Sequence, residues 1–385
     1  MLTIIIFILI LSLLVFVHEV GHFVVARKFG VKAEEFGLGF PPRGFGFYKN
    51  TEGKWKFVFG SKEVRDAADT VYSVNLIPLG GFVKIKGENG DSDDPDSFMN
   101  KKIWQRASIL AAGVTMNMVL AAALLSVGFM IGLPQALDGV NKKAEISDKN
   151  IQIIEVLPDS PAARSGFKFG DTILSVDNNE FTDNSELQDF VNGKVNQELE
   201  YKVKRGEGEK TFKVTPEIME ATGKGGIGIA IAETGTVKYP WYMAIWEGIK
   251  ATIILTWLIM AALYELLKNL ILGNGVTADI AGPVGIATMT GQAARMGLIY
   301  LIQFTALLSI NLAIVNFLPI PALDGGRILF LVIEKIKRRP VRRELEALLH
   351  NVGFILLMAL VVLVTFRDVM KLGDKFKMIW ERLIG

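Results

Sequence analysis

Two histidines and a glutamate near the amino terminus could bind a metal ion and use it. A motif of the form H-E-x-x-H at positions 18–22 ends an apolar run that opens at Leu2. Residues four apart lie on one face of a helix, so His18 and His22 can offer imidazole nitrogens to one ion, with Glu19 beside them as general base. The motif can arise by chance on a surface helix. At membrane depth, however, these residues are costly unless they have a function.

A third ligand is expected about 300 residues later. Asp324 is the lone carboxylate at the end of the uncharged run 296–323, where two prolines and two glycines should unwind a membrane helix. A helix-end cap near the interface is the alternative role for Asp324. Two histidines and one carboxylate form a zinc site with an open fourth position, and zinc, one per chain, would supply activated water. His350 lies in a different apolar run and is expected to have no part in the site.

Composition restricts the class of protein. The 385 residues are 50% hydrophobic with a net charge of +2, and the mean hydropathy is +0.36. This is too apolar for an ordinary soluble protein, and nothing in the charge suggests nucleic acid as a partner. The absence of cysteine excludes disulfides, thiol catalysis and cysteine metal sites. The first apolar run lacks a basic segment before it and a cleavage site, so we interpret it as a retained membrane span.

The hydropathy pattern predicts a polytopic α-helical membrane protein with four transmembrane helices. The spans are residues 1–30, 107–137, 296–326 and 347–366. Positive residues follow the first span, and a basic loop over 327–346 precedes the last one. The positive-inside rule therefore places the amino terminus outside and the metal motif near the cytoplasmic side. In the second span, Asn117 is either a packing residue or a part of the site.

Residues 241–272 decide the span count. Their uncharged part, Ala251 to Tyr264, has only 14 residues, which suits an interfacial or re-entrant helix better than a span. His18, His22 and Asp324 also meet at one depth only if this segment stays on the outer side. We therefore predict four spans, followed by a short amphipathic tail over 367–385.

Residues 31–106 form a loop on the cytoplasmic side and are rich in glycine. Gly37 to Pro42 is expected to be a turn or loop, and Val71 to Lys86 a β-hairpin around Pro78 to Gly81. A surface hairpin is one interpretation. The other is a membrane-associated hairpin near the active site, whose edge pairs with an extended substrate.

Residues 140–235 are soluble in character, with a helix expected near 185–191 and strands near 199–204 and 210–214. This segment resembles an extracytoplasmic PDZ domain of the bacterial protease type, an α+β fold that binds extended peptide ends by strand addition. A PDZ fold acting only as a plug or spacer is the alternative. The residues expected to form part of a peptide groove are Gly226, Ile227, Gly228 and Ile229.

Taken together, these motifs give the chain a close resemblance to the bacterial site-2 protease family, in its RseP-like, single-PDZ branch. They follow the family order: H-E-x-x-H at 18–22, G-x-x-x-N at 113–117, the PDZ segment, G-P-V-G-I-A at 282–287, and N-x-x-P-x-x-x-L-D-G at 316–325. The resemblance implies that His18, His22 and Asp324 ligate zinc, that Glu19 is the catalytic base, and that Asn316 and Asn117 hold the substrate or the site. It also implies that the hairpin, with Gly80, Gly81 and Val83, receives unwound substrate.

The resemblance further implies an enzyme of the bacterial cytoplasmic membrane that cuts peptide bonds within transmembrane segments. Its expected partners are the lipid bilayer and single-span proteins such as anti-sigma factors, or remnant signal peptides. The alternative is a catalytically inactive membrane PDZ protein that binds exported peptides. Glu19 separates the two, because a structural zinc site needs no glutamate that is not a ligand. A transporter would show internal repeats, and the sequence has none.

Overall fold

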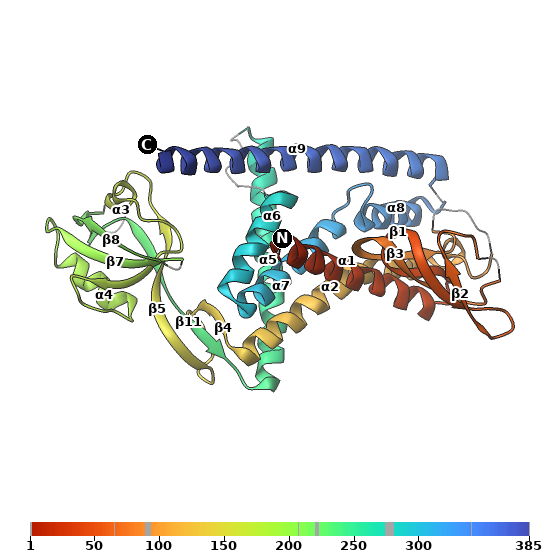
Figure 1. Ribbon diagram of the computed structural model, residues 1–385, viewed down its shortest axis with the longest axis horizontal. Helices are drawn as coiled ribbons and strands as arrows, with labels where there is room; N and C mark the ends of the chain where they lie inside the picture. Colours follow the sequence, from red (N-terminus) through yellow and green to blue (C-terminus); the bar gives the residue numbers. More distant parts are fainter. Residues whose placement is uncertain are drawn as a thin grey trace. The chain divides into compact units, whose positions relative to one another are not determined.

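The computed structural model describes residues 2–384 except 65, 89–93, 207, 220–222, 274–280 and 340, and it gives only the backbone of 343 and 372–384. The chain divides into two compact units (Figure 1). One unit, Met1–Ser126 with Ile245–Gly385, is mainly helical and holds a small sheet. The other, Val127–Ala244, is rich in β-strands.

Five of the described helices are long and apolar enough to cross a membrane, judged by length and composition. The remaining helices of the helical unit are α6 (Pro283–Met296), α8 (Asp324–Lys337) and the short η1 (Phe98–Asn100). Most of the loop predicted over 327–346 is therefore helical, and the last predicted span is part of a longer helix. The five long helices are α1 (Leu2–Lys28), α2 (Ile103–Ile131), α5 (Trp241–Ile271), α7 (Leu298–Phe317) and α9 (Arg343–Ile384).

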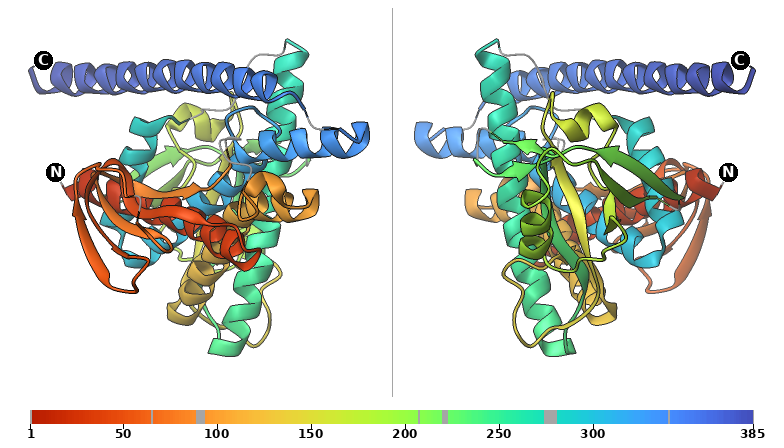
Figure 2. Two further views of the ribbon diagram at one scale, coloured as in Figure 1. Left: turned by 90° about the vertical axis from the view of Figure 1, so that its right-hand side faces the viewer. Right: turned by 90° about the vertical axis from the view of Figure 1, so that its left-hand side faces the viewer.

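Helix α5 is longer than the 14 uncharged residues suggested. It has 31 residues because it continues through charged positions, where Lys250 lies 3.6 Å from Glu247 and Lys268 lies 3.2 Å from Glu265. Near its amino end, Gly248 lies so close to Ser126 on α2 that a Cβ would collide with it. The helix runs crosswise to α9 in all three views (Figures 1 and 2). By length and composition, α5 is long and apolar enough to span a membrane.

The segment between α1 and α2 forms one sheet from β1 (Ala33–Lys49), β2 (Trp55–Phe59) and β3 (Val71–Ile85). The prediction of a hairpin over 71–86 is wrong. Residues 35–38 of β1 pair with 71–74 and also with 81–84, so β1 lies between the two halves of β3. The loop predicted at Gly37 to Pro42 is also wrong, because this stretch belongs to β1.

Glycine explains both errors. At Gly37 a Cβ would collide with Ser73, and Gly39 has a φ of +84°. A strand with larger residues at these positions could not lie between two neighbours and bend as β1 does. In the sequence, the same glycines resemble a loop.

The sheet is attached to α1 through the bend in the middle of β3. The Ser12 hydroxyl donates to the Pro78 carbonyl at 3.0 Å and accepts from the Gly80 N–H at 3.1 Å. Gly80 has a φ of +72°, and a Cβ there would collide with Val15. Gly81 similarly lies against the backbone of Phe16. The second half of β3 therefore lies along the face of α1 that precedes the metal motif.

The β-rich unit holds a six-stranded sheet in the order β4-β11-β5-β6-β7-β8, with α3 (Pro161–Ser165) and α4 (Asn184–Asn192). The predicted helix near 185–191 and the strands near 199–204 and 210–214 are confirmed. The sheet extends beyond the predicted 140–235 at both ends, because β4 precedes this range and β11 passes it. The strands are β4 (Leu133–Ala136), β5 (Glu145–Val156), β6 (Thr172–Val176), β7 (Leu199–Arg205), β8 (Gly208–Val214) and β11 (Ile229–Lys238), with the two-residue β9 (Glu217–Ile218) and β10 (Gly225–Gly226) forming a separate ladder.

Candidate metal centre

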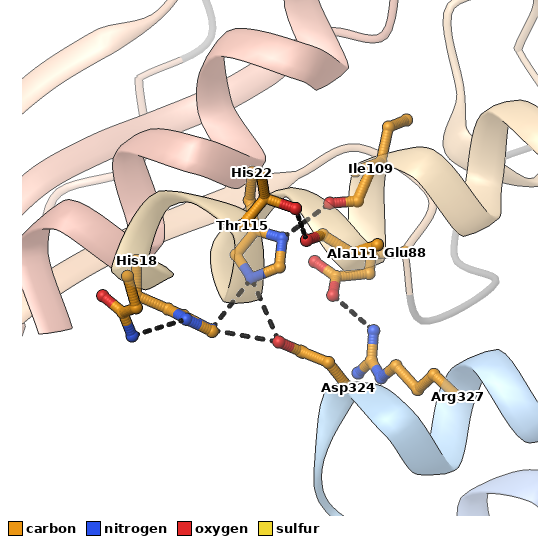
Figure 3. Close-up of polar contacts among 9 residues, drawn as sticks. His18, His22, Glu88, Ile109, Ala111, Thr115, Asp324 and Arg327 are labelled. Carbon is orange, nitrogen blue, oxygen red and sulfur yellow. Dashed lines mark hydrogen bonds and ion pairs between the residues drawn. The ribbon is translucent and has the colours of Figure 1, made fainter. Parts of the chain in front are cut away.

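Three ligand atoms from two helices converge in the helical unit (Figure 3). His18 and His22 lie one turn apart on the same face of α1, and Asp324 is the first residue of α8. Asp324 Oδ2 lies 3.0 Å from His18 Nε2 and 3.3 Å from His22 Nε2, and the two Nε2 atoms are 3.1 Å apart. The structure thus brings together the three ligands that the sequence predicted.

Both imidazoles are held by their other nitrogen. The Nδ1–H of His22 donates to the backbone carbonyl of Ile109 on α2 at 2.8 Å, which leaves the lone pair on Nε2. The Nδ1 of His18 faces the amide of the fully buried Asn117 at 3.4 Å. With its oxygen turned toward His18, Asn117 accepts the Nδ1–H and gains a partner for Oδ1. Of the two uses expected for Asn117, the geometry favours holding the site over contacting substrate.

The arrangement fits a cation. Asp324 Oδ2 is buried and has no hydrogen-bond donor within the described part of the chain. With the Asn117 amide turned in this way, both Nε2 atoms carry lone pairs toward Asp324 Oδ2, so three acceptors meet with no proton between them. Burying acceptors in this way is unfavourable unless a positive charge compensates. Two imidazoles and one carboxylate are a ligand set for zinc that leaves a fourth position open.

Glycines make room for this centre. A Cβ on Gly113 of α2 would collide with Nε2 of both histidines, so only glycine allows the imidazoles to lie against α2. At Gly21, a Cβ would collide with the carbonyl of Ala112, where α1 and α2 cross. Gly325 similarly lies against the carbonyls that end α7, which sets the start of α8 and with it Asp324.

A cavity of about 280 Å³ opens beside the ligands. Glu19 lines it next to His18 and Asp324, and Gly81 on β3 lies close to Glu19, since a Cβ on Gly81 would be 3.4 Å from that of Glu19. Asn316 lines the same cavity from α7. Glu19, the expected general base, and Asn316, expected to bind substrate, therefore lie beside the candidate metal ligands, with Gly81 of β3 close to Glu19.

The residues expected to form the peptide groove belong to the β-rich unit and not to the metal centre. Ile227 is 2% exposed and packs in the hydrophobic core, so its side chain does not line a groove. The Gly228 carbonyl accepts a hydrogen bond from Leu157 N–H. Gly228 has a φ of +77°, and a Cβ there would collide with Ser160. Gly226 pairs with Glu217, and Ile229 opens β11.

Two groups around the centre were not predicted. The carbonyl of Ile109 has no sequence signature, because any residue supplies a carbonyl. An ion pair between Glu88 and Arg327, one turn after Asp324, lies beside the ligands (Figure 3). His350, expected to be inert, accepts a hydrogen bond from Ala322 N–H at 2.9 Å. Its partner, Ala322, is two residues from Asp324.

Comparison with known proteins agrees with this chemistry. The model of peptidase family M50 matches residues 6–360. The regulator of sigma-W protease RasP of Bacillus subtilis is 30% identical, over 96% of this chain and 99% of that protein. The zinc metalloprotease RasP of Geobacillus kaustophilus is 28% identical, over 96% and 98% respectively. Solved PDZ domains are similar in part, including that of an SdrC-like protein from Listeria monocytogenes, at 25% identity, covering 23% of this chain and 92% of that one with a TM-score of 0.21.

Proposed function

Because the chain belongs to peptidase family M50 and is an intramembrane zinc metalloprotease of the site-2 type, we propose that His18, His22 and Asp324 hold its zinc and that Glu19 is its general base. The observation that carries the proposal is the convergence of Asp324 Oδ2 and two imidazole Nε2 atoms without a donor among them. Glu19 lies beside these atoms but is not one of them.

The chain's own residues divide the work of peptide hydrolysis. Zinc, when bound, supplies an activated water and polarises the scissile carbonyl. Glu19 faces the cavity, where its carboxylate can take a proton from the attacking water and later give it to the leaving amine. Asn316 carries a donor and an acceptor on one amide, so it can bind one peptide unit of the substrate in the same cavity.

The outer edge of β3 can hold the substrate in an extended form. Lys86 N–H donates to Lys32 carbonyl, and N–H groups alternate in direction along an antiparallel strand, so that of Val83 points away from β1. Gly81, two residues earlier, lies against α1 close to Glu19. A substrate helix must unwind before it can be cut, and its freed backbone groups need partners in the membrane. Strand addition along residues 81–85 would supply them next to the base.

The topology we propose has four spans, α1, α2, α7 and α9, with α5 lying along the outer face. The short uncharged stretch of α5, 14 residues between Lys250 and Glu265, supports this, because it is shorter than the about 20 apolar residues that a span needs. The positive residues Arg27 and Lys28 at the end of α1 support a cytoplasmic position for that end. The amino terminus and the β-rich unit are then extracytoplasmic in a bacterial cytoplasmic membrane.

The proposed substrates are single-span membrane proteins or remnant signal peptides, cut within their membrane segment. One relative is named as a regulator of sigma-W, which supports an anti-sigma factor as a substrate. The β-rich unit would act as a PDZ domain that binds extended peptide ends. On β11, residues 234–237 already pair with β4 and the Glu233 carbonyl accepts from Leu137 N–H, whereas 229–232 pair only with β5 in the described ladders, so the latter stretch could add a peptide strand.

Replacement of Glu19 tests the assignment of the base. Glu19→Gln should lower cleavage of a tagged single-span substrate on the order of 10²- to 10⁴-fold, because it removes a general base. Zinc content should stay at that of the wild type, because Glu19 is not a ligand. Both are measured on purified full-length protein, with Glu265→Gln on α5 as a matched control. A Glu19→Gln variant that cleaves at the wild-type rate would overturn the proposed mechanism.

A further inference from the structure

His350 lies on α9 and contacts the turn that presents Asp324. Six residues join the end of α7 at Phe317 to the start of α8 at Asp324, and they include a turn at 321–322. Within this turn Ala322 has a φ of +81°, a left-handed conformation that is unfavourable for a residue with a Cβ. Such a conformation persists only where the surroundings hold it. The position of the Asp324 carboxylate therefore depends on contacts that fix this turn.

Helix α9 supplies two such contacts from one face. His350 Nδ1 accepts the Ala322 N–H at 2.9 Å. Three residues later, Gly353 lies so close to Pro321 that a Cβ there would collide with the proline backbone. The imidazole also packs against the Phe330 ring of α8, with centroids 5.8 Å apart. The side chain is thus fixed between the turn and the helix that follows it.

The hydrogen bond also fixes the tautomer of His350. Because Ala322 N–H is the donor, Nδ1 must carry the lone pair, and the proton of the neutral ring is on Nε2. Nε2 is buried and has no acceptor among the described residues. The contact with Ala322 is therefore the one polar interaction that the described structure gives this imidazole. A histidine is costly within a membrane helix, and this contact gives it a role that the metal ligands do not.

We propose that His350 is a positioning residue for the metal centre: it holds the Ala322 turn so that Asp324 Oδ2 stays within reach of His18 and His22. It does not touch the metal or the substrate. The inference rests on the proposed function, because it takes Asp324 to be a zinc ligand. It replaces the expectation that His350 is inert.

Three substitutions at position 350 separate the hydrogen bond from packing. In His350→Asn, the amide oxygen can occupy the place of Nδ1 and keep the acceptor. In His350→Gln, the amide oxygen falls nearer the place of Nε2, and in His350→Leu no acceptor remains. The readout is the rate at which purified full-length protein loses zinc to a chelator, together with cleavage of a single-span substrate. Asn351→Leu, a change at the next position of α9, serves as the control.

The proposal expects His350→Leu and His350→Gln to lose zinc on the order of tenfold faster than the wild type, as for groups that orient metal ligands. His350→Asn and Asn351→Leu should stay within about threefold of the wild type on the same scale. Equal zinc retention by all variants would overturn the proposal, as would an Asn variant that loses zinc as fast as the Leu variant. Thermal unfolding of each variant shows whether it is misfolded. If His350→Leu is misfolded, zinc loss is compared between His350→Asn and His350→Gln, which are both polar and differ in the place of the acceptor.

Asp324→Asn, measured alongside, distinguishes this failure from that of the proposed function. If Asp324→Asn retains zinc, the ligand assignment itself is wrong. If it loses zinc while His350→Leu does not, the ligand assignment holds and the positioning role fails.

Discussion

Each unit of the molecule buries a carboxylate, and the two are treated in opposite ways. In the β-rich unit, Asp171 is fully buried and accepts two hydrogen bonds from Arg205, each at 2.6 Å, and one from Lys168 N–H at 2.9 Å. In the helical unit, Asp324 Oδ2 has no donor and faces two imidazole nitrogens. One carboxylate is neutralised by the protein, whereas the other is left for a cation.

The difference shows how a buried charge can be assigned to structure or to function. A bidentate arginine completes the environment of Asp171, so the carboxylate needs nothing further and holds β6 to β7. Asp324 Oδ2 instead faces two imidazole nitrogens and has no hydrogen-bond donor among the described residues, an arrangement that is unfavourable without a compensating cation. Zinc is therefore expected to stabilise the helical unit, whereas the β-rich unit should be indifferent to it.

The largest expected effect on stability comes from removing Arg205, the cation that pairs with the buried Asp171. Arg205→Met leaves Asp171 buried without a counter-charge, which should destabilise the β-rich unit by about 3–5 kcal/mol. Unfolding of this unit can be followed by pulse proteolysis of the full-length protein. The zinc content should not change.

Arg164→Met is the matched control for this change. Arg164 pairs with Glu217 at 2.6 Å, but both side chains are more than half exposed, so its loss should cost less than about 1 kcal/mol. If Arg205→Met and Arg164→Met were equally stable, the pair of Arg205 with the buried Asp171 would contribute no more to stability than the exposed pair, and this prediction would be wrong.

A smaller effect is expected from filling the space around the ligands. Gly113→Ala places a methyl group where the two imidazoles lie, and should weaken zinc binding on the order of 10- to 100-fold. Alanine favours a helix over glycine by about 1 kcal/mol, so loss of helix cannot explain a weaker site. Competition with a chromogenic chelator measures the affinity.

The control for this change is Thr115→Ala, at an exposed position on the same helix whose hydroxyl contacts only the Ala111 carbonyl. It should bind zinc as the wild type does. Unchanged affinity in Gly113→Ala would mean that the imidazoles lie elsewhere when zinc is bound.

The three candidate ligands could be predicted from the sequence because each lies in a short local pattern. A spacing of four fixes two imidazoles on one helix face, and the prolines and glycines before and after Asp324 mark a break in a membrane helix. The strands and helix tested in the PDZ segment were likewise predictable from short patterns. The candidate metal centre, and one helix and two strands of the β-rich unit, could thus be predicted without coordinates.

What could not be predicted depends on contacts between distant segments. Gly37 and Gly39 indicated a loop, yet the close approach of β3 makes them part of a strand. His350 appeared inert because its partner is a backbone N–H 28 residues away. The carbonyl of Ile109 orients His22 without any demand on residue type. In each case the chemistry belongs to the backbone, which the sequence does not distinguish.

The most direct test of the account is the zinc content of Asp324→Asn, measured by mass spectrometry on purified full-length protein. Asparagine keeps the shape of the side chain but removes the charge, so the variant should hold far less than one zinc per chain, whereas the wild type holds one. Asp368→Asn is the matched control, because this buried carboxylate accepts Gly285 N–H at 2.7 Å, and an amide oxygen can do the same. One zinc per chain in Asp324→Asn, at wild-type affinity, would contradict the assignment of the third ligand.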